Sequence, residues 1–385
     1  MEIRVFTAFS GYDSQCMALD RLHQHNPDFT YELVGWAEID KYAIQAHNAV
    51  YPQWAERNYG DISKIDWAQV PDFDLFTYSS PCQDFSQAGK QAGGTEGSGT
   101  RSSLLWECRR AILAKRPKYL LMENVAALVS QKFIRLFNAW QLELESYGYR
   151  NFAKVLNAKD YGVPQNRERI FMVSVLDEQA RYEFPDPMPL TIRLKDVLEK
   201  EVEERYYLKA DALEGFMPNE KQDDTVVLGW SRSQEGKGEV ISRHPVKVAN
   251  CVTAGKRDNT QNYVVEPMIG AFRGRNPENP SERGRSNGMY KQRLEINENG
   301  TSNTLTGVQK DNMVIEYGYR IRKLTERECF RLMDMPEEYI DRIQAAGISR
   351  SQQYKMAGNS IVVACMYHIW RKLFIDTEIK TLTLF

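Results

Sequence analysis

The stretch IRVFTAFSGYDSQCMALDRL, residues 3–22, decides the fold class. Its first seven residues, IRVFTAF, form the short apolar run that is typical of a buried strand. The following SQCMALDRL has apolar residues at helical spacing, at Cys16, Leu19 and Leu22. Gly11 lies between the two segments, where the chain must turn tightly. A strand, a turn and a helix in this order indicate the start of an α/β unit.

The same alternation continues along the chain and predicts an α/β fold with a mainly parallel sheet. Residues 151–176 differ, because two strand-like runs surround a turn-rich middle, and we expect an antiparallel pair at one edge of the sheet. The remaining strand candidates are YELVGWAEID (31–40), DLFTYSS (74–80) and KYLLMENV (118–125), and the helix candidates between them are KYAIQAHNAV (41–50) and SLLWECRRAILAKRP (103–117).

The chain of 385 residues is longer than one hydrophobic core usually supports, which predicts a large domain and a smaller one. Three prolines in FPDPMPL, residues 184–190, disfavour both helix and central strand and mark a boundary. We therefore expect a first domain at 1–184, a second at 185–319, and C-terminal helices at 320–385 that pack back on the first domain.

Composition excludes several classes of protein. The net charge of -2 gives no global cationic field, so any contact with nucleic acid must come from a local basic patch. No two of the six cysteines have CxxC spacing and the first residues lack a leader pattern, which indicates a reducing cytoplasm and argues against a metal site. No apolar run approaches the ~20 residues that span a bilayer.

Acidic residues follow the early strand candidates, where α/β proteins bind their ligands. Glu38 comes after the second strand and Asp61 follows in YGDI. The first can accept hydrogen bonds from ribose hydroxyls, and the second from an adenine amino group. Each acid alone is more often a solvated helix cap or turn than a ligand-binding residue. Together, and in this order, they favour an adenosine-containing cofactor.

Cys82, in YSSPCQDFS (78–86), is a candidate nucleophile. A free cysteine is more often a small buried apolar side chain. Cys82, however, follows Pro81 at the end of a strand and leads into a glycine-rich stretch, which predicts a mobile loop. Glu123 follows the neighbouring strand, so the pair is a candidate acid and nucleophile.

Two further stretches carry clustered arginines. In QNRERI (165–170), Arg167 and Arg169 fall on one face of an extended segment and can bind carbonyl or phosphate oxygens, although a salt-bridged strand has the same pattern. The stretch FRGRNPENPSERGRSNGMYKQR (272–293) is the clearest basic patch. It is either a disordered loop or a segment suited to phosphate and base-edge contacts. Its candidate DNA-binding residues are Arg273, Arg275, Arg283 and Arg285.

Taken in order, eight segments resemble the motifs of the DNA (cytosine-5) methyltransferases: FSGYDS, GWAEID, YGDI, PCQDFS, MENV, QNRERI, RKLTERECFRLMDMP and AGNSIVVA. The likeness covers residues 4–176 and 320–373, and the unmatched middle corresponds to the variable target-recognition region of that family. The resemblance implies a Rossmann-like S-adenosyl-L-methionine-dependent methyltransferase domain with a smaller target-recognition domain.

The resemblance also implies the reaction, which is methyl transfer to C5 of a cytosine flipped out of double-stranded DNA. Cys82 would attack C6, and Glu123 would hydrogen-bond N3 and the exocyclic amine. Arg169 would hold O2, while Arg167 would support the thiolate or a nearby phosphate. Gln83 and Ser86 would contact DNA from the glycine-rich loop as it closes over the minor groove.

For the cofactor, S-adenosyl-L-methionine, the resemblance assigns Phe9, Ser10, Gly11, Glu38, Ile39, Asp61, Ile62, Asn359 and Ser360. Asn359 and Ser360 would close the methionine pocket from the C-terminal helices. One departure is that the family usually has two further glycines where this chain has Asp13 and Ser14. Asp tolerates a left-handed backbone, so we expect the turn to survive.

Two rival functions remain at this point. A tRNA cytosine-5 methyltransferase shares most motifs but typically carries a Cys-Phe-Thr tripeptide, which residues 185–318 lack. A non-catalytic DNA-binding protein would not need the full catalytic set. We expect double-stranded DNA as partner, a monomer without membrane contact, a nucleoid-associated location in a prokaryotic or phage-infected cell, and at most a cognate restriction endonuclease in the same system that is not a stable partner.

Overall fold

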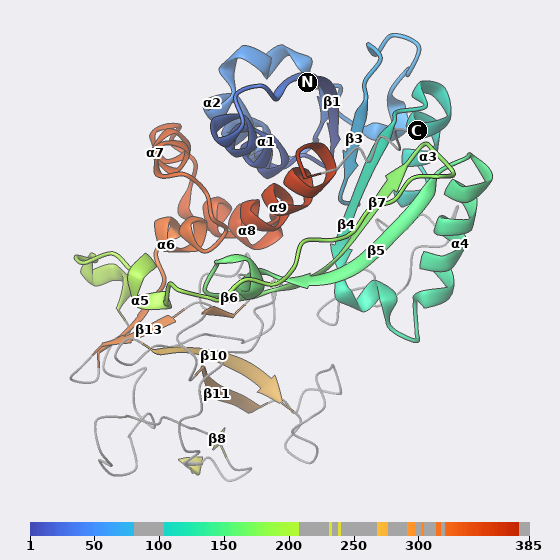
Figure 1. The fold of residues 1–385 in the computed structure, drawn as a ribbon. Helices are drawn as coiled ribbons and strands as arrows, with labels where there is room; N and C mark the ends of the chain where they lie inside the picture. The colour runs from blue at the N-terminus through green and yellow to red at the C-terminus, as the bar shows by residue number, and fades with distance from the viewer. Residues whose placement is uncertain are drawn as a thin grey trace.

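The structure is a computed structural model, and it describes residues 1–80, 104–207, 231–232, 238–239, 268–275, 291–297, 302–303, 313–316 and 320–376. Within these residues the first domain is built around a six-stranded sheet of order β2-β1-β3-β4-β7-β5 (Figure 1). Its strands are β1 (Glu2–Ala8), β2 (Thr30–Ala37), β3 (Leu75–Tyr78), β4 (Tyr119–Val125), β5 (Arg150–Asn157) and β7 (Glu168–Val175).

The sheet is mixed but mainly parallel. Strands β2, β1, β3 and β4 pair in parallel, whereas β7 pairs antiparallel with both β4 and β5. Both the predicted α/β fold and the predicted antiparallel pair at one edge are confirmed.

A bulge between Val5 and Phe6 shifts the register against β2, and a Cβ at Gly35 would lie 2.7 Å from the Phe6 ring. Glycine is therefore required at this point of β2.

Helices cover both faces of the sheet, as Figure 1 shows, and each face has its own hydrophobic core. Adjacent residues of β4 divide between the cores, with Leu121 on one face and Leu120 and Met122 on the other. The helices of the first face are α1 (Ser14–His25), α2 (Lys41–Val50), α6 (Glu326–Arg331), α7 (Glu337–Ala345), α8 (Arg350–Asn359) and α9 (Val363–Phe374), and those of the second are α3 (Cys108–Lys115) and α4 (Ile134–Ser146).

The last helix of the described chain packs against the first. Helix α9 packs against α1, and the Phe374 ring stacks on Phe29 with centroids 5.4 Å apart. Short turns complete this part of the chain at η1 (Pro52–Arg57), η2 (Ile62–Lys64), η4 (Ala126–Val129), η5 (Ala158–Tyr161), α5 (Leu194–Val197) and η6 (Glu204–Tyr206).

A second, four-stranded sheet has the order β11-β10-β13-β14 in the described part of the chain. Two short strand pairs are not hydrogen-bonded into this sheet: β12 pairs in parallel with β6, and β8 pairs antiparallel with β9. Strand β14 pairs with β13 and is followed directly by the C-terminal helices. The domain limits at 184 and 319 stay predictions. The strands are β6 (Gln165–Asn166), β8 (Ser231–Arg232), β9 (Gly238–Glu239), β10 (Met268–Arg275), β11 (Lys291–Asn297), β12 (Ser302–Asn303), β13 (Met313–Glu316) and β14 (Arg320–Lys323).

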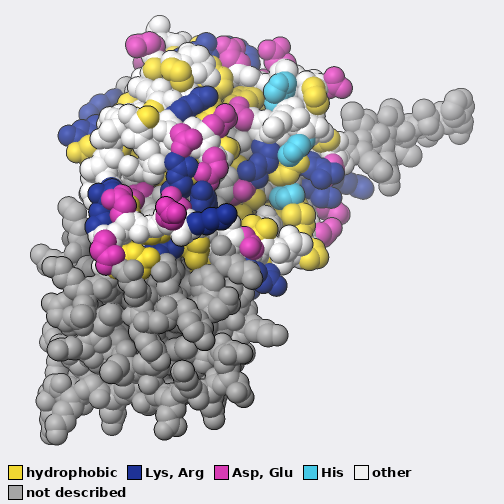
Figure 2. All heavy atoms as spheres, turned by 90° about the vertical axis from the view of Figure 1, so that its left-hand side faces the viewer, with side chains coloured by type: hydrophobic (Ala, Val, Ile, Leu, Met, Phe, Trp, Pro, Cys, Tyr) yellow, Lys and Arg dark blue, Asp and Glu magenta, His cyan; other side chains and the backbone are white. Residues whose placement is uncertain are grey.

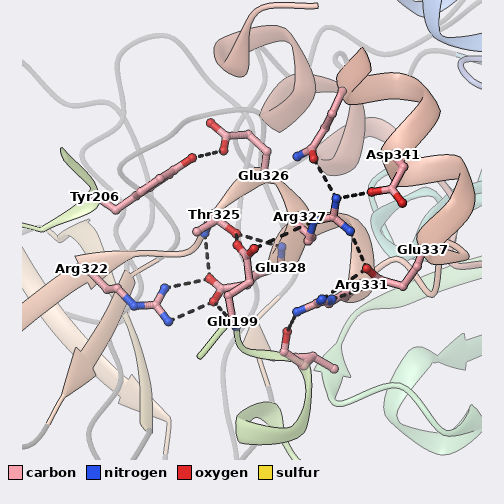
Figure 3. A network of polar contacts seen from close by, with 12 residues as sticks. Glu199, Tyr206, Arg322, Thr325, Glu326, Arg327, Glu328, Arg331, Glu337 and Asp341 are labelled. Atoms are coloured by element: carbon pink, nitrogen blue, oxygen red, sulfur yellow. Dashed lines mark hydrogen bonds and ion pairs between the residues drawn. The ribbon is translucent and has the colours of Figure 1, made fainter. Parts of the chain in front are cut away.

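A polar network fixes the start of the C-terminal helices (Figure 3). The buried Arg322 guanidinium donates to both carboxylate oxygens of Glu328, at 2.8 and 2.9 Å. Thr325 and Glu328 form a capping box at the beginning of α6. Glu328 also accepts the backbone N–H of Glu199, so this network ties the polypeptide after α5 to α6.

Two details differ from the sequence prediction. The helix expected over 103–117 is shorter, because residues 104–107 form tight turns with i to i+3 hydrogen bonds before α3 begins. Asp61 does not follow a strand. The chain meets the sheet there only through a single bridge from Asn58 to Trp36, and Asp61 then caps η2.

The surface around α2, α6 and α7 has Lys and Arg side chains interleaved with Asp and Glu (Figure 2). This mixture agrees with the balanced charge of the sequence and gives that face no field of one sign. Among the described residues, no helix is long and apolar enough to cross a bilayer.

Candidate active site

The turn after β1 is left-handed at three of five residues. Phe9, Gly11 and Asp13 have φ angles of 56, 59 and 67°, and a Cβ at Gly11 would meet nothing within 4 Å. Such a backbone costs about 1–3 kcal/mol at each non-glycine residue and persists only where its surroundings fix it. Ser10 helps to fix it, because its hydroxyl donates to the Thr7 carbonyl at 2.9 Å. The open space beside Gly11 leaves room for a ligand.

Asp13 adopts a left-handed conformation, with φ 67° and ψ 56°, as we expect for a turn that can hold Asp at this position. Its carboxylate is fully buried and caps α1 by accepting the Cys16 N–H at 3.2 Å. The Thr7 hydroxyl donates to the other carboxylate oxygen at 2.9 Å. The turn therefore survives the substitution, and the carboxylate supplies contacts that glycine could not make.

Glu38 follows β2, the strand beside β1, and its side chain contacts the turn after β1. Its carboxylate accepts backbone N–H groups from Gly11 at 3.0 Å, Ile39 at 2.7 Å and Asp40 at 2.8 Å. Ile39 is 69% exposed beside it, which is unusual for a large apolar side chain. The arrangement presents an acidic group and an apolar surface side by side.

Asn58 is a residue of this region that the motif analysis missed. Its side-chain amide and the Glu38 backbone exchange two hydrogen bonds of 3.2 Å, and its Oδ1 also accepts from Gly60. The only signal for it in the sequence is its place just before YGDI. Asp61 then accepts the Ser63 hydroxyl at 2.8 Å, which holds its carboxyl pKa below the usual value, and Ile62 is buried.

The ends of β3 and β4 are tied together by Asn124. Its side-chain amide donates to the Ser80 carbonyl at 3.1 Å, and both residues are buried. The adjacent Glu123 is therefore held at the sheet edge where the chain leaves β3 for Pro81 and Cys82. Cys82, Gln83 and Ser86 themselves lie outside the described residues.

Glu123 is buried and pairs with Arg169, whose Nε lies 3.1 Å from Oε1. Burial raises the pKa of the Glu123 carboxyl, and this effect outweighs the opposing influence of Arg169 and Arg167. A buried carboxyl with a raised pKa can hold a proton and donate it in a hydrogen bond. Such groups are concentrated at functional sites.

Arg167 is buried, in contrast to Arg169 two residues away. Its guanidinium donates to the carbonyls of Gly358 at 3.0 Å and Ser360 at 2.5 Å. It does bind carbonyl oxygens, as the pattern of QNRERI allowed, but these belong to the last turn of α8 and to the residue that follows it. Ser360 is half-buried there and Asn359 is exposed.

Four other cysteines illustrate the alternative that the sequence left open for Cys82, which is a small buried apolar side chain. Cys16, Cys108, Cys329 and Cys365 are buried, and desolvation raises the pKa of each thiol. These four are inert packing residues. The described residues also contain no group of three His, Cys, Asp or Glu side chains placed to hold a metal ion.

The basic patch begins and ends in a strand pair. The register of β10 and β11 sets Arg273 opposite Arg293 and Arg275 opposite Lys291. Arg283 and Arg285 lie outside the described residues.

Comparison with known proteins defines the class. The sequence model of the family described as C-5 cytosine-specific DNA methylase matches residues 3–374. The chain is 30% identical to the Type II methyltransferase M2.ScrFI of Lactococcus lactis subsp. cremoris, over 97% of this chain and 99% of that protein. It is 29% identical to the orphan methyltransferase M.SPRI of Bacillus phage SPR, over 97% of each chain.

The fold agrees with solved methyltransferases. The S. pombe Dnmt2 methyltransferase superposes with a TM-score of 0.59 at 15% identity, covering 96% of this chain and 97% of that one. The α/β sheet is thus that of a Rossmann-like methyltransferase domain. The chain belongs to the C-5 cytosine-specific DNA methylase family. It is a DNA (cytosine-5-)-methyltransferase.

Proposed function

We propose that the protein methylates C5 of a cytosine that is flipped out of a specific double-stranded DNA sequence, through a covalent bond between the Cys82 sulfur and C6. The observation that carries the proposal is the buried Glu123, which lies near the end of β4, has a raised pKa and pairs with Arg169. A flipped cytosine that has lost its hydrating water needs a hydrogen-bond donor at N3 and a cation at its carbonyl oxygen O2.

The chain's own residues would perform the covalent steps. The Cys82 thiolate forms a bond to C6 while Glu123 donates its proton toward N3, so that the ring gains no net charge. C5 thereby becomes nucleophilic and accepts the methyl group. Loss of the C5 proton to a base and breakage of the sulfur–C6 bond then restore the thiolate, while the N3 proton returns to Glu123 and neutral 5-methylcytosine is released.

Arg169 would hold cytosine O2, since its guanidinium already lies beside Glu123. We propose that Arg167 acts indirectly, because its buried guanidinium holds the last turn of α8 and the residue that follows it in place. Asn124 supports the assignment of Cys82, because it fixes Ser80, two residues before the thiol.

S-adenosyl-L-methionine would supply the electrophilic methyl group when bound. The residues fit that cofactor, because the turn at Gly11 has open space beside it and Glu38 retains acceptor capacity for ribose hydroxyls. Phe9 and Ser10 would complete the turn, and Ile39 and Ile62 would offer apolar surface to adenine. Asp61 would accept the adenine amino group, and Asn359 with Ser360 would close the methionine end.

The second sheet would carry the contacts to DNA. Its basic strand pair β10–β11 is linked to the catalytic edge through β12, which contacts β10 and pairs with Gln165 and Asn166 immediately before Arg167. Arginines and lysines placed there would bind phosphates and fix the register of the duplex. We expect the protein to be a monomer. We also expect that any cognate restriction endonuclease in the same system is not a stable partner.

The decisive experiment mixes the purified protein with methyl-labelled S-adenosyl-L-methionine and either duplex DNA or tRNA. We expect label in duplex DNA, at C5 of cytosine. Label in tRNA alone would support the tRNA methyltransferase, and label in neither would support a non-catalytic DNA-binding protein. Bisulfite sequencing of DNA from cells that express the protein would then identify the flanking bases.

A further inference from the structure

Asp13 contacts three structural elements besides its own turn. Its buried carboxylate receives the Thr7 hydroxyl from the end of β1 and the Cys16 N–H from α1. Its Oδ2 also lies 3.5 Å from Nε2 of His47, in the middle of α2. A buried carboxylate is retained only where such partners offset its desolvation.

His47 connects Asp13 to the strand that carries Glu38. The imidazole is fully buried and stacks on the Trp36 ring, with centroids 3.7 Å apart and planes 18° from parallel. Trp36 lies two residues before Glu38 in the chain. The sequence of contacts from Asp13 through His47 to Trp36 therefore joins the turn after β1 to the segment after β2.

Ser14 makes the corresponding contact on the opposite side. The Ser360 hydroxyl donates to the Ser14 hydroxyl at 3.1 Å, and Ser14 is buried at the first position of α1. Asp13 and Ser14 thus contact different segments. Asp13 contacts His47, which stacks on Trp36 near Glu38, and Ser14 contacts Ser360.

We infer that Asp13 and Ser14 are positioning residues for the cofactor, which hold the left-handed turn in register with the other two cofactor segments. The inference rests on the proposed function, because it takes S-adenosyl-L-methionine to bind at this turn. Neither side chain would touch the reacting atoms. Their removal should therefore weaken cofactor binding and leave the chemical step largely intact.

Three variants test the inference in the full-length protein. Asp13→Gly keeps a residue that adopts positive φ freely, so any weakening of binding cannot come from backbone strain. Asp13→Asn keeps an oxygen that can cap α1, and Ser14→Ala removes only the hydroxyl. Calorimetric titration with S-adenosyl-L-methionine should show the dissociation constant raised about tenfold in Asp13→Gly, and about threefold in Asp13→Asn and Ser14→Ala.

Asp20→Asn is the matched control. Asp20 lies on the same helix α1, is half-buried, and accepts the hydroxyls of Tyr31, Tyr51 and Tyr339, away from the turn. This variant should lower the melting temperature yet bind the cofactor normally. If it weakened binding as much as Asp13→Gly, general loss of packing would explain the effect and the inference would be wrong.

Steady-state kinetics provide the second readout. KM for S-adenosyl-L-methionine should rise in the Asp13 and Ser14 variants while kcat at saturating cofactor changes much less. Wild-type affinity in all three variants would overturn the inference and leave the proposed function standing, whereas wild-type protein that binds no cofactor would end the proposed function itself. If Asp13→Gly does not fold, Asp13→Asn and Ser14→Ala still decide the question.

Discussion

The proposed cofactor side and the proposed substrate side of the sheet edge differ in which groups contact their carboxylates. On the cofactor side, Glu38 accepts three backbone N–H groups. On the substrate side, Glu123 is buried beside one close guanidinium, Arg169, and its pKa is raised. Backbone N–H donors hold the Glu38 carboxylate in place, where it shapes a loop, whereas burial favours a Glu123 carboxyl that can carry a proton. The first arrangement suits binding and the second suits chemistry.

The largest expected effect is on the substrate side. Cys82→Ser should abolish methyl transfer, because a serine hydroxyl is not ionised at neutral pH and is a far weaker nucleophile than a thiolate. A duplex that contains 5-fluorocytosine should trap the wild-type protein as a covalent adduct, detectable by its mass. Cys251→Ser, outside the motifs, is the control and should behave as wild type. An adduct that still formed in Cys82→Ser would disprove the assignment.

Glu123→Gln should lower kcat about 10²- to 10⁴-fold, because the amide cannot transfer a proton to N3. The pH dependence of the rate gives a second test, because its direction can be predicted. Since the folded pKa of Glu123 is raised, the protonated carboxyl is favoured at low pH and is lost as the pH rises through that raised pKa. We expect kcat/KM of the wild type to fall along this limb, and the limb to be absent from Glu123→Gln.

Glu145→Gln makes the same chemical change at an exposed position of α4 and serves as the control for Glu123→Gln. Its rate and pH profile should match the wild type. A Glu123→Gln variant with the wild-type pH limb would show that another group carries the titration.

Glu38→Gln should affect the proposed cofactor side of the sheet edge. The glutamine side chain has one acceptor oxygen where the carboxylate has two, so at least one backbone N–H loses its partner. We expect KM for S-adenosyl-L-methionine to rise about 10- to 100-fold, with kcat at saturating cofactor much less affected. If kcat fell as far as in Glu123→Gln, the two sides would not be functionally separate.

The smallest effect should come from the basic strand pair. Arg273→Ala with Arg293→Ala should weaken DNA binding, and the slope of log affinity against log salt should fall by about 1 for each phosphate that the variant no longer binds. Cofactor affinity should not change. Arg371→Ala, on the exposed part of α9, is the control. An equal decrease in DNA and cofactor affinity in the double variant would indicate that the strand pair has only a structural role.

Much of the fold could be predicted because it depends on local patterns. The spacing of Cys16, Leu19 and Leu22 defines the buried face of α1, and the apolar runs define β1 to β4. The cap at Asp61 could not be separated from a strand end, because a short polar turn gives both the same pattern. The different burial of Arg167 and Arg169 was also unpredictable, since it depends on α8 and α9, nearly two hundred residues away.

The contact between Ser14 and Ser360 also has a consequence for synthesis of the protein. A ribosome produces the strands of the sheet long before it produces α8 and α9, and domains generally begin to fold from the N-terminus. The methionine end of the proposed pocket stays incomplete until the last helices have emerged and packed on α1. A prematurely terminated chain would therefore carry its catalytic motifs yet lack a finished cofactor pocket, so partial products of translation would leave the genome unmodified.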